Sequence, residues 1–296
     1  ERYNIYIVDV KGTDWHVNLD NGHVAAINKN DFSFNNWAQA GWFDYAYITI
    51  HGRPGENGIM QGYFELINIP YSTCDVLMSA LTFDKFVLNR YLKSYGIRVP
   101  ESILLRIGDE YDEKEIEAKI GMPCFIKPAT DGSSFGVSKV KNADQIAPAL
   151  RKAFMESSEV MVEGFLDGIE ITQGIYKTKE KSVPFPITEV VTSNEFFDYN
   201  AKYNGEVDEI TPARISNELA ERVTEITSRI YDILHANGII RIDYIITKDN
   251  EGNDVINMLE VNTTPGMTTT SFIPQQVRAA GLDIKDVLSD IVENQF

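Results

Sequence analysis

Hydrophobic runs alternate with polar, glycine-rich and proline-containing segments along the whole chain, and their two periods predict a mixed α/β protein. Short apolar runs predict strands at residues 3–10 and 45–50, with an irregular segment between them. Apolar residues at helical spacing predict helices at about 59–68, 79–95, 143–156 and 218–235. No repeat or low-complexity tract interrupts this pattern, so we expect one compact multidomain chain.

The clearest predicted element is a β-hairpin at residues 239–262, IIRIDYIITKDNEGNDVINMLEVN. Its two apolar runs flank a Gly/Asn/Asp-rich turn, which is typical of hairpins. If Lys248 pairs with Val255, Asp243 falls directly opposite Glu260. Because side chains alternate along a strand, the hairpin directs residues 240, 242, 244 and 246 into a core.

The other face of this hairpin carries Arg241 and Asp243 on one strand and Glu260 and Asn262 on the next. Two carboxylates directly across a ladder lie about 5 Å apart and repel each other. A cation between them relieves the repulsion, and Asp, Glu and Asn together form an oxygen-only set suited to Mg²⁺ or Mn²⁺. The alternative is a solvated acidic face that Arg241 neutralises, and the hairpin alone does not decide between the two. A register slip of one residue would separate the carboxylates.

The segment NTTPGMTTTSFIP follows the hairpin directly. A tight turn at residues 264–266 can direct backbone N–H groups towards a negative centre. Ser271 then begins a predicted helix, where free N–H groups favour a carboxylate or a phosphate. The alternative is an ordinary strand-to-helix connection with a capping serine.

A second candidate site lies at residues 125–139, FIKPATDGSSFGVSK. An apolar strand ends on Lys127 and is followed by a Gly/Ser-rich loop, a combination that suggests phosphate binding. The sequence lacks the G-x-x-x-x-G-K-[S/T] phosphate loop, and this loop leads into a strand and opens no helix.

Size and charge narrow the class of protein. The chain has 296 residues, enough for two or three domains with a site between them. The net charge of −17 argues against a nucleic-acid or anionic-membrane surface but leaves room for a local nucleotide pocket. Cys74 and Cys124 form no paired motif, which favours buried thiols in a reducing cytoplasm. No apolar run reaches the length of a membrane span, and nothing indicates a signal peptide.

Taken together, five segments resemble the D-alanine–D-alanine ligase family, which has the ATP-grasp fold. The resemblance covers nearly the whole chain, in order: HGRPGENGIMQGYFELINIPY, KPATDGSSFGVSKV, EGFLDGIE, FFDYNAKY, and RIDY with LEVNTTPGMTTTSFIP. It implies an α/β (α+β) protein of three domains, with ATP clamped between the central and C-terminal domains. The implied domains span residues 1–78, 79–167 and 168–296, and a lid loop spans residues 193–214.

The resemblance implies a Rossmann-like N-terminal α/β domain that lacks its first strand and Gly-rich loop here. In the family, that loop carries the acid that anchors the ammonium of the first substrate. The first residue is Glu1 and a strand follows almost immediately, so we expect that an N-terminal piece precedes this sequence. Two further departures are Phe197, where many members have tyrosine, and Pro54, which replaces a common glycine.

The family joins two D-alanine molecules through a D-alanyl phosphate, with ATP as co-substrate and Mg²⁺ or Mn²⁺, two ions, as cofactors. By resemblance, Asp243, Glu260 and Asn262 hold the ions. The implied ATP-binding residues are Lys85, Lys127, Ser133, Ser134, Glu163, Phe165, Leu166, Glu170, Phe196 and Lys202. The implied D-alanine-binding residues are His51, Arg241, Gly266, Ser271 and Phe272. The implied catalytic residues are Arg241, Gly266, Lys202, Ser133 and Tyr203, and the last two latch the lid.

Taken alone, Lys85, Lys127 and His51 each also have an ordinary structural explanation. The resemblance further implies a cytoplasmic homodimer for peptidoglycan precursor synthesis, with no nucleic-acid or membrane partner. Three other functions compete with this one: a depsipeptide ligase that joins D-alanine to D-lactate, another ATP-grasp carboxylate–amine ligase, and an inactive nucleotide-binding protein. Tyr203 after Lys202 favours the dipeptide ligase over the depsipeptide ligase.

Overall fold

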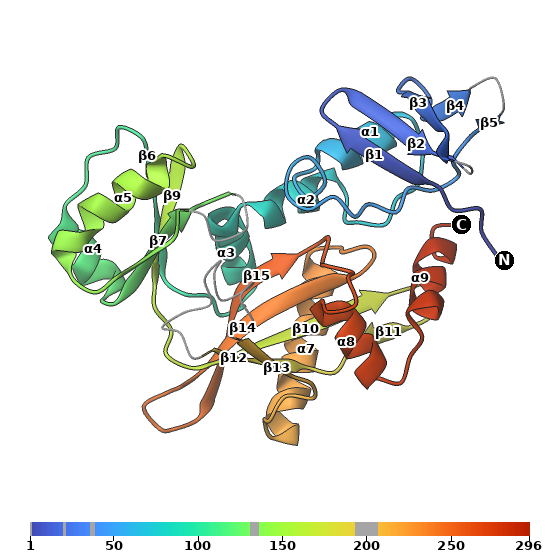
Figure 1. Ribbon diagram of the computed structural model, residues 1–296. Helices are drawn as coiled ribbons and strands as arrows, with labels where there is room; N and C mark the ends of the chain where they lie inside the picture. The colour runs from blue at the N-terminus through green and yellow to red at the C-terminus, as the bar shows by residue number, and fades with distance from the viewer. Residues whose placement is uncertain (1, 20–21, 36–38, 131–135, 193–206) are drawn as a thin grey trace.

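The chain folds around three β-sheets that follow one another along the sequence (Figure 1). The computed structural model describes residues 2–19, 22–35, 39–130, 136–192 and 207–296. This mixture of helices and sheets agrees with the predicted α/β class. The predicted domain boundaries at 78/79 and 167/168 stay predictions.

The first sheet is an antiparallel meander that helix α1 (Ile59–Leu66) covers on one face. Its strands are β1 (Ile7–Lys11), β2 (Asp14–Asn18), β3 (Val24–Asn28), β4 (Ser33–Asn35) and β5 (Ala40–Gly41). The segment predicted to be irregular therefore contains four strands. They are short, and their outward positions are largely polar, so their apolar runs are too brief to stand out.

The predicted strand at residues 45–50 is wrong, because this segment forms only an isolated parallel bridge between Ala46 and Tyr71. A Rossmann-like domain requires a parallel sheet. Among the described residues of the first segment, this bridge is the one parallel pairing, and the strands pair antiparallel. The predicted helix at 79–95 is two helices, α2 (Val76–Phe83) and α3 (Lys85–Ser94). Asp84 separates them because its backbone is extended and its side chain caps α3.

The central sheet contains the predicted phosphate-loop strand. Its strand order is β6 (Ser102–Arg106), β9 (Glu159–Gly164), β7 (Cys124–Pro128) and β8 (Ser138–Val140). Helices α4 (Glu113–Ile120) and α5 (Ile146–Phe154) cover one face, where Ile126 and Val162 are buried in the core. A short 3₁₀ helix, η2 (Ala143–Gln145), leads into α5. Lys127 and Glu163 alternate with these core residues and so lie on the opposite face.

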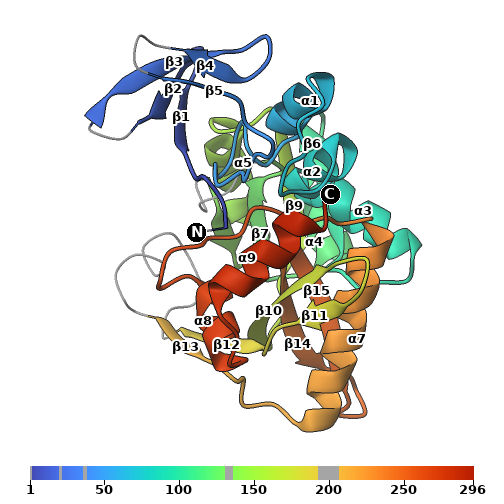
Figure 2. The ribbon, with the colours of Figure 1, turned by 90° about the vertical axis from the view of Figure 1, so that its right-hand side faces the viewer.

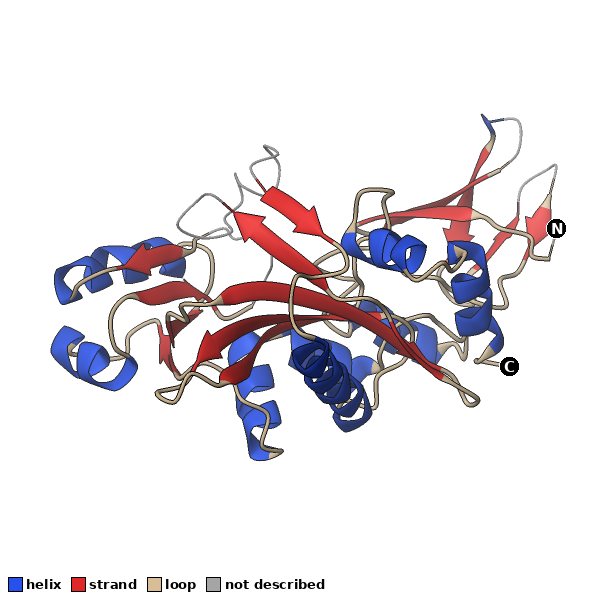
Figure 3. Ribbon diagram, turned by 90° about the horizontal axis from the view of Figure 1, so that it is seen from below, coloured by secondary structure: helices blue, strands red, loops and turns tan. Residues whose placement is uncertain are grey.

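The third sheet crosses the middle of the molecule (Figure 3). Its strand order is β13 (Val207–Ile210), β12 (Thr188–Thr192), β10 (Ile169–Lys177), β14 (Ile240–Lys248) and β15 (Asp254–Asn262), and β11 (Ser182–Pro184) also pairs with β10. Helix α7 (Asn217–Ile233) packs against one face. Helices α8 (Phe272–Ala279) and α9 (Ile284–Glu293) cover the other (Figure 2).

The predicted hairpin is β14 and β15, and Asp243 lies opposite Glu260 as predicted. The pairing assumed near the turn is wrong, because Lys248 pairs with Asp254 and Thr247 pairs with Val255. A β-bulge next to Asp243 and Tyr244 absorbs the difference of one residue. The predicted inward residues Ile240, Ile242, Tyr244 and Ile246 are all buried.

Candidate active site

Two rows of side chains cross the third sheet on the face opposite α7, and they form the centre of the candidate site. In the first row, Thr172 of β10 pairs with Asp243, which pairs with Glu260. In the second row, Gly174 pairs with Arg241, which pairs with Asn262. The strand pairing thus places all four predicted hairpin residues on one surface.

Asp243 is the most heavily bonded side chain of this surface. The Arg241 guanidinium binds it in a bidentate manner, with Nε donating to Oδ1 and Nη2 donating to Oδ2, both at 2.9 Å. Asn262 Nδ2 donates to Oδ2 at 3.1 Å, and the Thr172 hydroxyl donates to Oδ1 at 2.5 Å. Burial disfavours the charged guanidinium, but the attraction and hydrogen bonds of Asp243 outweigh it and raise the pKa of Arg241.

Helix α3 connects the hairpin to the central sheet. Lys85, its first residue, places Nζ 3.4 Å from Glu260 Oε1. The backbone N–H of Lys85 donates to the Ala129 carbonyl, directly after β7. Figure 1 shows α3 between the central sheet and the third sheet. The lysine predicted to reach the phosphates therefore lies at the junction of the two sheets.

A second polar cluster lies on the face of the central sheet opposite α5. Lys127 Nζ lies 2.5 Å from Glu163 Oε2, and both side chains are largely buried. Asn89 of α3 donates from Nδ2 to Glu163 Oε1 at 3.3 Å. Next to this cluster, Lys139 Nζ lies 4.0 Å from the ring centroid of Phe165. The predicted adenine hinge and the predicted phosphate lysine are thus in direct contact.

The segment after the hairpin carries three predicted substrate residues, Gly266, Ser271 and Phe272, and brings them to the Arg241 side of the candidate site. A Cβ atom on Gly266 would lie 2.8 Å from Ser271 Oγ, so the glycine permits this close approach. Ser271 is the N-cap of α8 and its hydroxyl shares a hydrogen bond with Thr268. Phe272 places its ring centroid 5.1 Å from the Arg241 guanidinium carbon.

His51 lies on the loop before α1 and faces the same region. Its Nδ1 is 3.7 Å from Glu56 Oε1, while Glu56 Oε2 accepts from the Gly52 N–H at 2.7 Å. The Glu56 carboxylate raises the pKa of His51 against the opposing effect of partial burial, and a backbone hydrogen bond involving Thr264 adds to the rise.

The remaining predicted residues divide into two groups. Leu166 and Glu170 are half-buried at the hinge and at the start of β10. Ser133, Ser134, Phe196, Lys202 and Tyr203 lie outside the described residues, as do Phe197 and most of the lid loop. The predicted buried thiols are confirmed, because Cys74 and Cys124 are both free and buried.

Four residues of the site were not identified from the sequence. Glu56 could have been found from its place five residues after His51, since a carboxylate so near a histidine is a common partner. Asn89 lies one helical turn after Lys85, on the same face of α3. Thr172 reaches Asp243 because β10 pairs with β14, and Gln276 of α8 donates to the Thr172 carbonyl. One sequence does not reveal either contact.

The side chains present fit a divalent ion of the Mg²⁺ type. Asp243, Glu260 and Asn262 offer two carboxylates and an amide oxygen, and Mg²⁺ in nucleotide sites takes few protein ligands in addition to phosphate oxygens. The described residues contain no cluster of three or more His, Cys, Asp or Glu side chains that could hold a metal. A fully protein-ligated metal centre is therefore not found in this part of the chain.

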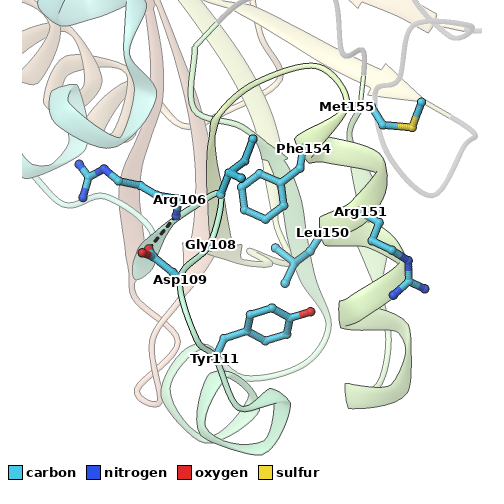
Figure 4. A pocket seen from close by; sticks show the side chains of 9 residues that line it. Arg106, Gly108, Asp109, Tyr111, Leu150, Arg151, Phe154 and Met155 are labelled. Atoms are coloured by element: carbon cyan, nitrogen blue, oxygen red, sulfur yellow. Dashed lines mark hydrogen bonds between the residues drawn. The ribbon is translucent and has the colours of Figure 1, made fainter.

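A separate cavity of about 300 Å³ lies on the α5 side of the central sheet. Figure 4 shows Leu150 and Phe154 of α5 facing Tyr111 across it. Because α5 covers the face opposite Lys127 and Glu163, this cavity is separate from both polar clusters.

No described helix is both long and apolar enough to cross a membrane.

Comparison with known proteins identifies the family. The model of the D-Ala–D-Ala ligase C-terminus matches residues 91–293. D-alanine–D-alanine ligase from Bacteroides fragilis is 63% identical over 296 residues, which are 100% of this chain and 90% of that protein. The corresponding enzyme from Phocaeicola vulgatus is 62% identical with the same coverage.

Solved structures agree with these relatives. VanG D-Ala:D-Ser ligase from Enterococcus faecalis has a TM-score of 0.83 at 31% identity, covering 96% of this chain and 87% of that one. D-alanine–D-alanine ligase from Bacillus anthracis complexed with ATP has a TM-score of 0.72 at 31% identity, covering 86% and 79%. These neighbours confirm the predicted ATP-grasp fold. The chain belongs to the D-alanine–D-alanine ligase family.

Proposed function

We propose that this protein joins two D-alanine molecules into D-alanyl-D-alanine and converts ATP to ADP and phosphate. The observation that carries the proposal is the pairing of Asp243 with Glu260 on adjacent strands, with Lys85 and Arg241 beside them. Opposed carboxylates flanked by cationic side chains suit a nucleoside triphosphate with its divalent ion.

In the first step, a carboxylate oxygen of one D-alanine attacks the γ-phosphorus of ATP, and the bond to the ADP oxygen breaks. Such a step requires charge neutralisation and in-line positioning. Lys85 and Lys127 contact the phosphates as point charges. Asp243, Glu260 and Asn262 would hold two Mg²⁺ or Mn²⁺ ions, which neutralise phosphate oxygens when bound.

In the second step, the amine of the second D-alanine attacks the acyl carbon of the D-alanyl phosphate. The carbon–oxygen bond to phosphate then breaks, and the amine loses a proton. Arg241 and the N–H of Gly266 stabilise the tetrahedral oxyanion, a contribution of typically a few kcal/mol for each donor. The N-terminal end of α8, at Ser271 and Phe272, takes the carboxylate of the second D-alanine.

The nucleotide base occupies the region between the two sheets. Glu163 holds Lys127 and keeps acceptor capacity for the exocyclic amine of adenine. Phe165, Leu166 and Phe196 line the adenine slot, and Glu170 binds the ribose hydroxyls. Ser133, Ser134 and Lys202 contact the phosphates, while the pair of Ser133 and Tyr203 closes the lid. His51, oriented by Glu56, lies beside the first D-alanine.

The reaction supplies a dipeptide for peptidoglycan precursors, and its dependence on ATP places it in the cytoplasm. We also propose a homodimer, for which light scattering coupled to size-exclusion chromatography is the direct measurement. A mass of twice 33.4 kDa supports the dimer, and a mass of 33.4 kDa contradicts it.

The function is tested by phosphate release with ATP and D-alanine, together with mass spectrometry of the product. We expect D-alanyl-D-alanine, no phosphate release without D-alanine, and less product when D-lactate or D-serine is the second substrate. Dominant D-alanyl-D-lactate would instead support a depsipeptide ligase. ATP binding without phosphate release in any mixture would support an inactive nucleotide-binding protein.

A further inference from the structure

Thr172 fixes one oxygen of the Asp243 carboxylate from a neighbouring strand. The two residues are directly paired between β10 and β14, and Thr172 is 1% exposed. Its hydroxyl donates to Asp243 Oδ1 at 2.5 Å. Because water is excluded from Thr172, no solvent molecule can readily replace this donor if the hydroxyl is removed.

Gln276 of α8 binds the β10 backbone on both sides of Gln173, at Thr172 and Gly174, and is fully buried. Its Nε2 donates to the Thr172 carbonyl at 3.0 Å and to the Thr188 hydroxyl at 3.1 Å. Its Oε1 accepts from the Gly174 N–H at 2.9 Å. All the polar atoms of its amide group therefore have partners, and such satisfied buried networks are rigid.

The same helix carries the proposed acceptor site. Ser271 caps α8 five residues before Gln276, and Phe272 stacks against Arg241. Hydrogen bonds through Thr172 and Gln276 therefore join the Asp243 carboxylate to α8, whose first turn takes the second D-alanine in the proposed reaction. Neither Thr172 nor Gln276 is among the residues that the proposed reaction uses.

We infer that Thr172 and Gln276 are positioning residues for the two ends of this site. Thr172 orients the Asp243 carboxylate towards the divalent ion, and Gln276 sets the position of α8 relative to that carboxylate. The inference rests on the proposed function, because it takes Asp243 as an ion ligand and the start of α8 as the acceptor site.

The role of Thr172 is tested by the affinity for Mn²⁺ in the presence of AMP-PNP, measured by electron paramagnetic resonance without turnover. Thr172→Val should weaken Mn²⁺ binding about 10- to 100-fold, the usual effect of losing a partner of a metal ligand. Thr172→Ser, which keeps the hydroxyl, should restore it. The matched control is Thr227→Val, because Thr227 is equally buried and shares its hydroxyl hydrogen bond with Tyr244 on the other face of the sheet.

The results separate this inference from the proposed function. Wild-type Mn²⁺ affinity in Thr172→Val, with loss of affinity in Asp243→Asn, would overturn the role of Thr172 and leave the ion site standing. Unchanged affinity in Asp243→Asn would overturn the proposed ion site itself. An equal loss in Thr172→Val and Thr227→Val would mean that the effect is general destabilisation, and it would overturn the inference.

The role of Gln276 is tested by measuring the KM for the second D-alanine and the KM for ATP separately. Gln276→Leu should raise the KM for the second D-alanine about 2- to 30-fold, the range produced by residues that couple two sites, with a smaller change in the KM for ATP. Gln173→Leu is the control, because Gln173 is equally buried but faces the opposite side of the same strand. Equal changes in both constants, or the same change in Gln173→Leu, would overturn the role.

Discussion

Asp243 and Arg241 show how single side chains at this site depend on one another. Both side chains are mostly buried, at 16% and 18% exposed, and each balances the charge of the other. Removal of one partner leaves an uncompensated charge in a region with little water. Stability and the proposed catalysis therefore depend on the same pair.

We expect Asp243→Asn to lower the free energy of unfolding by about 3–5 kcal/mol because Arg241 loses its counter-charge. The same change should lower kcat/KM at least about 100-fold. Urea unfolding and steady-state kinetics measure the two effects. Asp254→Asn is the control, since Asp254 pairs with the exposed Lys248 at the far end of the hairpin and should cost at most about 1 kcal/mol. Similar losses in the two variants would contradict the prediction.

His51 and Glu56 form the titratable pair of the site. The Glu56 carboxylate raises the pKa of His51, so the stabilisation from protonated His51 is fully present below its unfolded pKa of about 6.5. It is lost as the pH rises through the higher folded pKa. We expect Glu56→Gln to lower the pKa of His51 in an NMR titration, while the midpoints of the other histidines stay in place. An unchanged His51 midpoint would show that Glu56 is not the cause.

Strands and helices position these side chains. Some of these elements were predicted correctly from the sequence and others were missed. The hairpin was predictable because its apolar alternation is long and its turn is rich in Gly, Asn and Asp. The pairing of Asp243 with Glu260 was correct although the assumed pairing at the turn was wrong, because the bulge restored the register. The strands β2 to β5 were missed because their apolar runs are short.

The contact between β10 and α8 was not predictable, and Gly174 is the residue that permits it. A Cβ atom there would lie 2.4 Å from Ile273 Cδ1 and 2.9 Å from Gln276 Oε1. We expect Gly174→Ala to displace α8 and to destabilise the protein by about 1–3 kcal/mol, measured by thermal unfolding. In contrast, Gly62→Ala in α1 meets nothing closer than 3.7 Å and should be neutral or stabilising. An unchanged melting temperature in Gly174→Ala would contradict the tight packing.

The molecule as a whole is acidic, yet three cationic side chains lie together at the candidate site. The net charge is −17, while Lys85, Lys127 and Arg241 all lie at the candidate site. The proposed nucleotide lies between two sheets that helix α3 connects, so binding should stabilise both. The hairpin pattern pointed to Arg241, the strand and Gly/Ser-rich loop pointed to Lys127, and the family resemblance added Lys85. Their ionic partners were not predictable in the same way, because several of these contacts join distant segments.

We therefore expect Mg²⁺ with AMP-PNP to raise the melting temperature. A ligand at 100 times its Kd contributes about 2.7 kcal/mol to the folded state. Lys127→Met should abolish most of the shift, whereas Lys248→Met, at the exposed end of the hairpin, should preserve it. Full stabilisation of Lys127→Met by the nucleotide would contradict the assignment of this lysine.

The most direct test of the site is the position of Mn²⁺ in a crystal grown with AMP-PNP, located by anomalous scattering. The proposed function predicts an anomalous peak about 2.0–2.6 Å from oxygen atoms of Asp243, Glu260 and Asn262 and next to the phosphates. A nucleotide-bound crystal in which the peak lies away from Asp243 and Glu260 would contradict it.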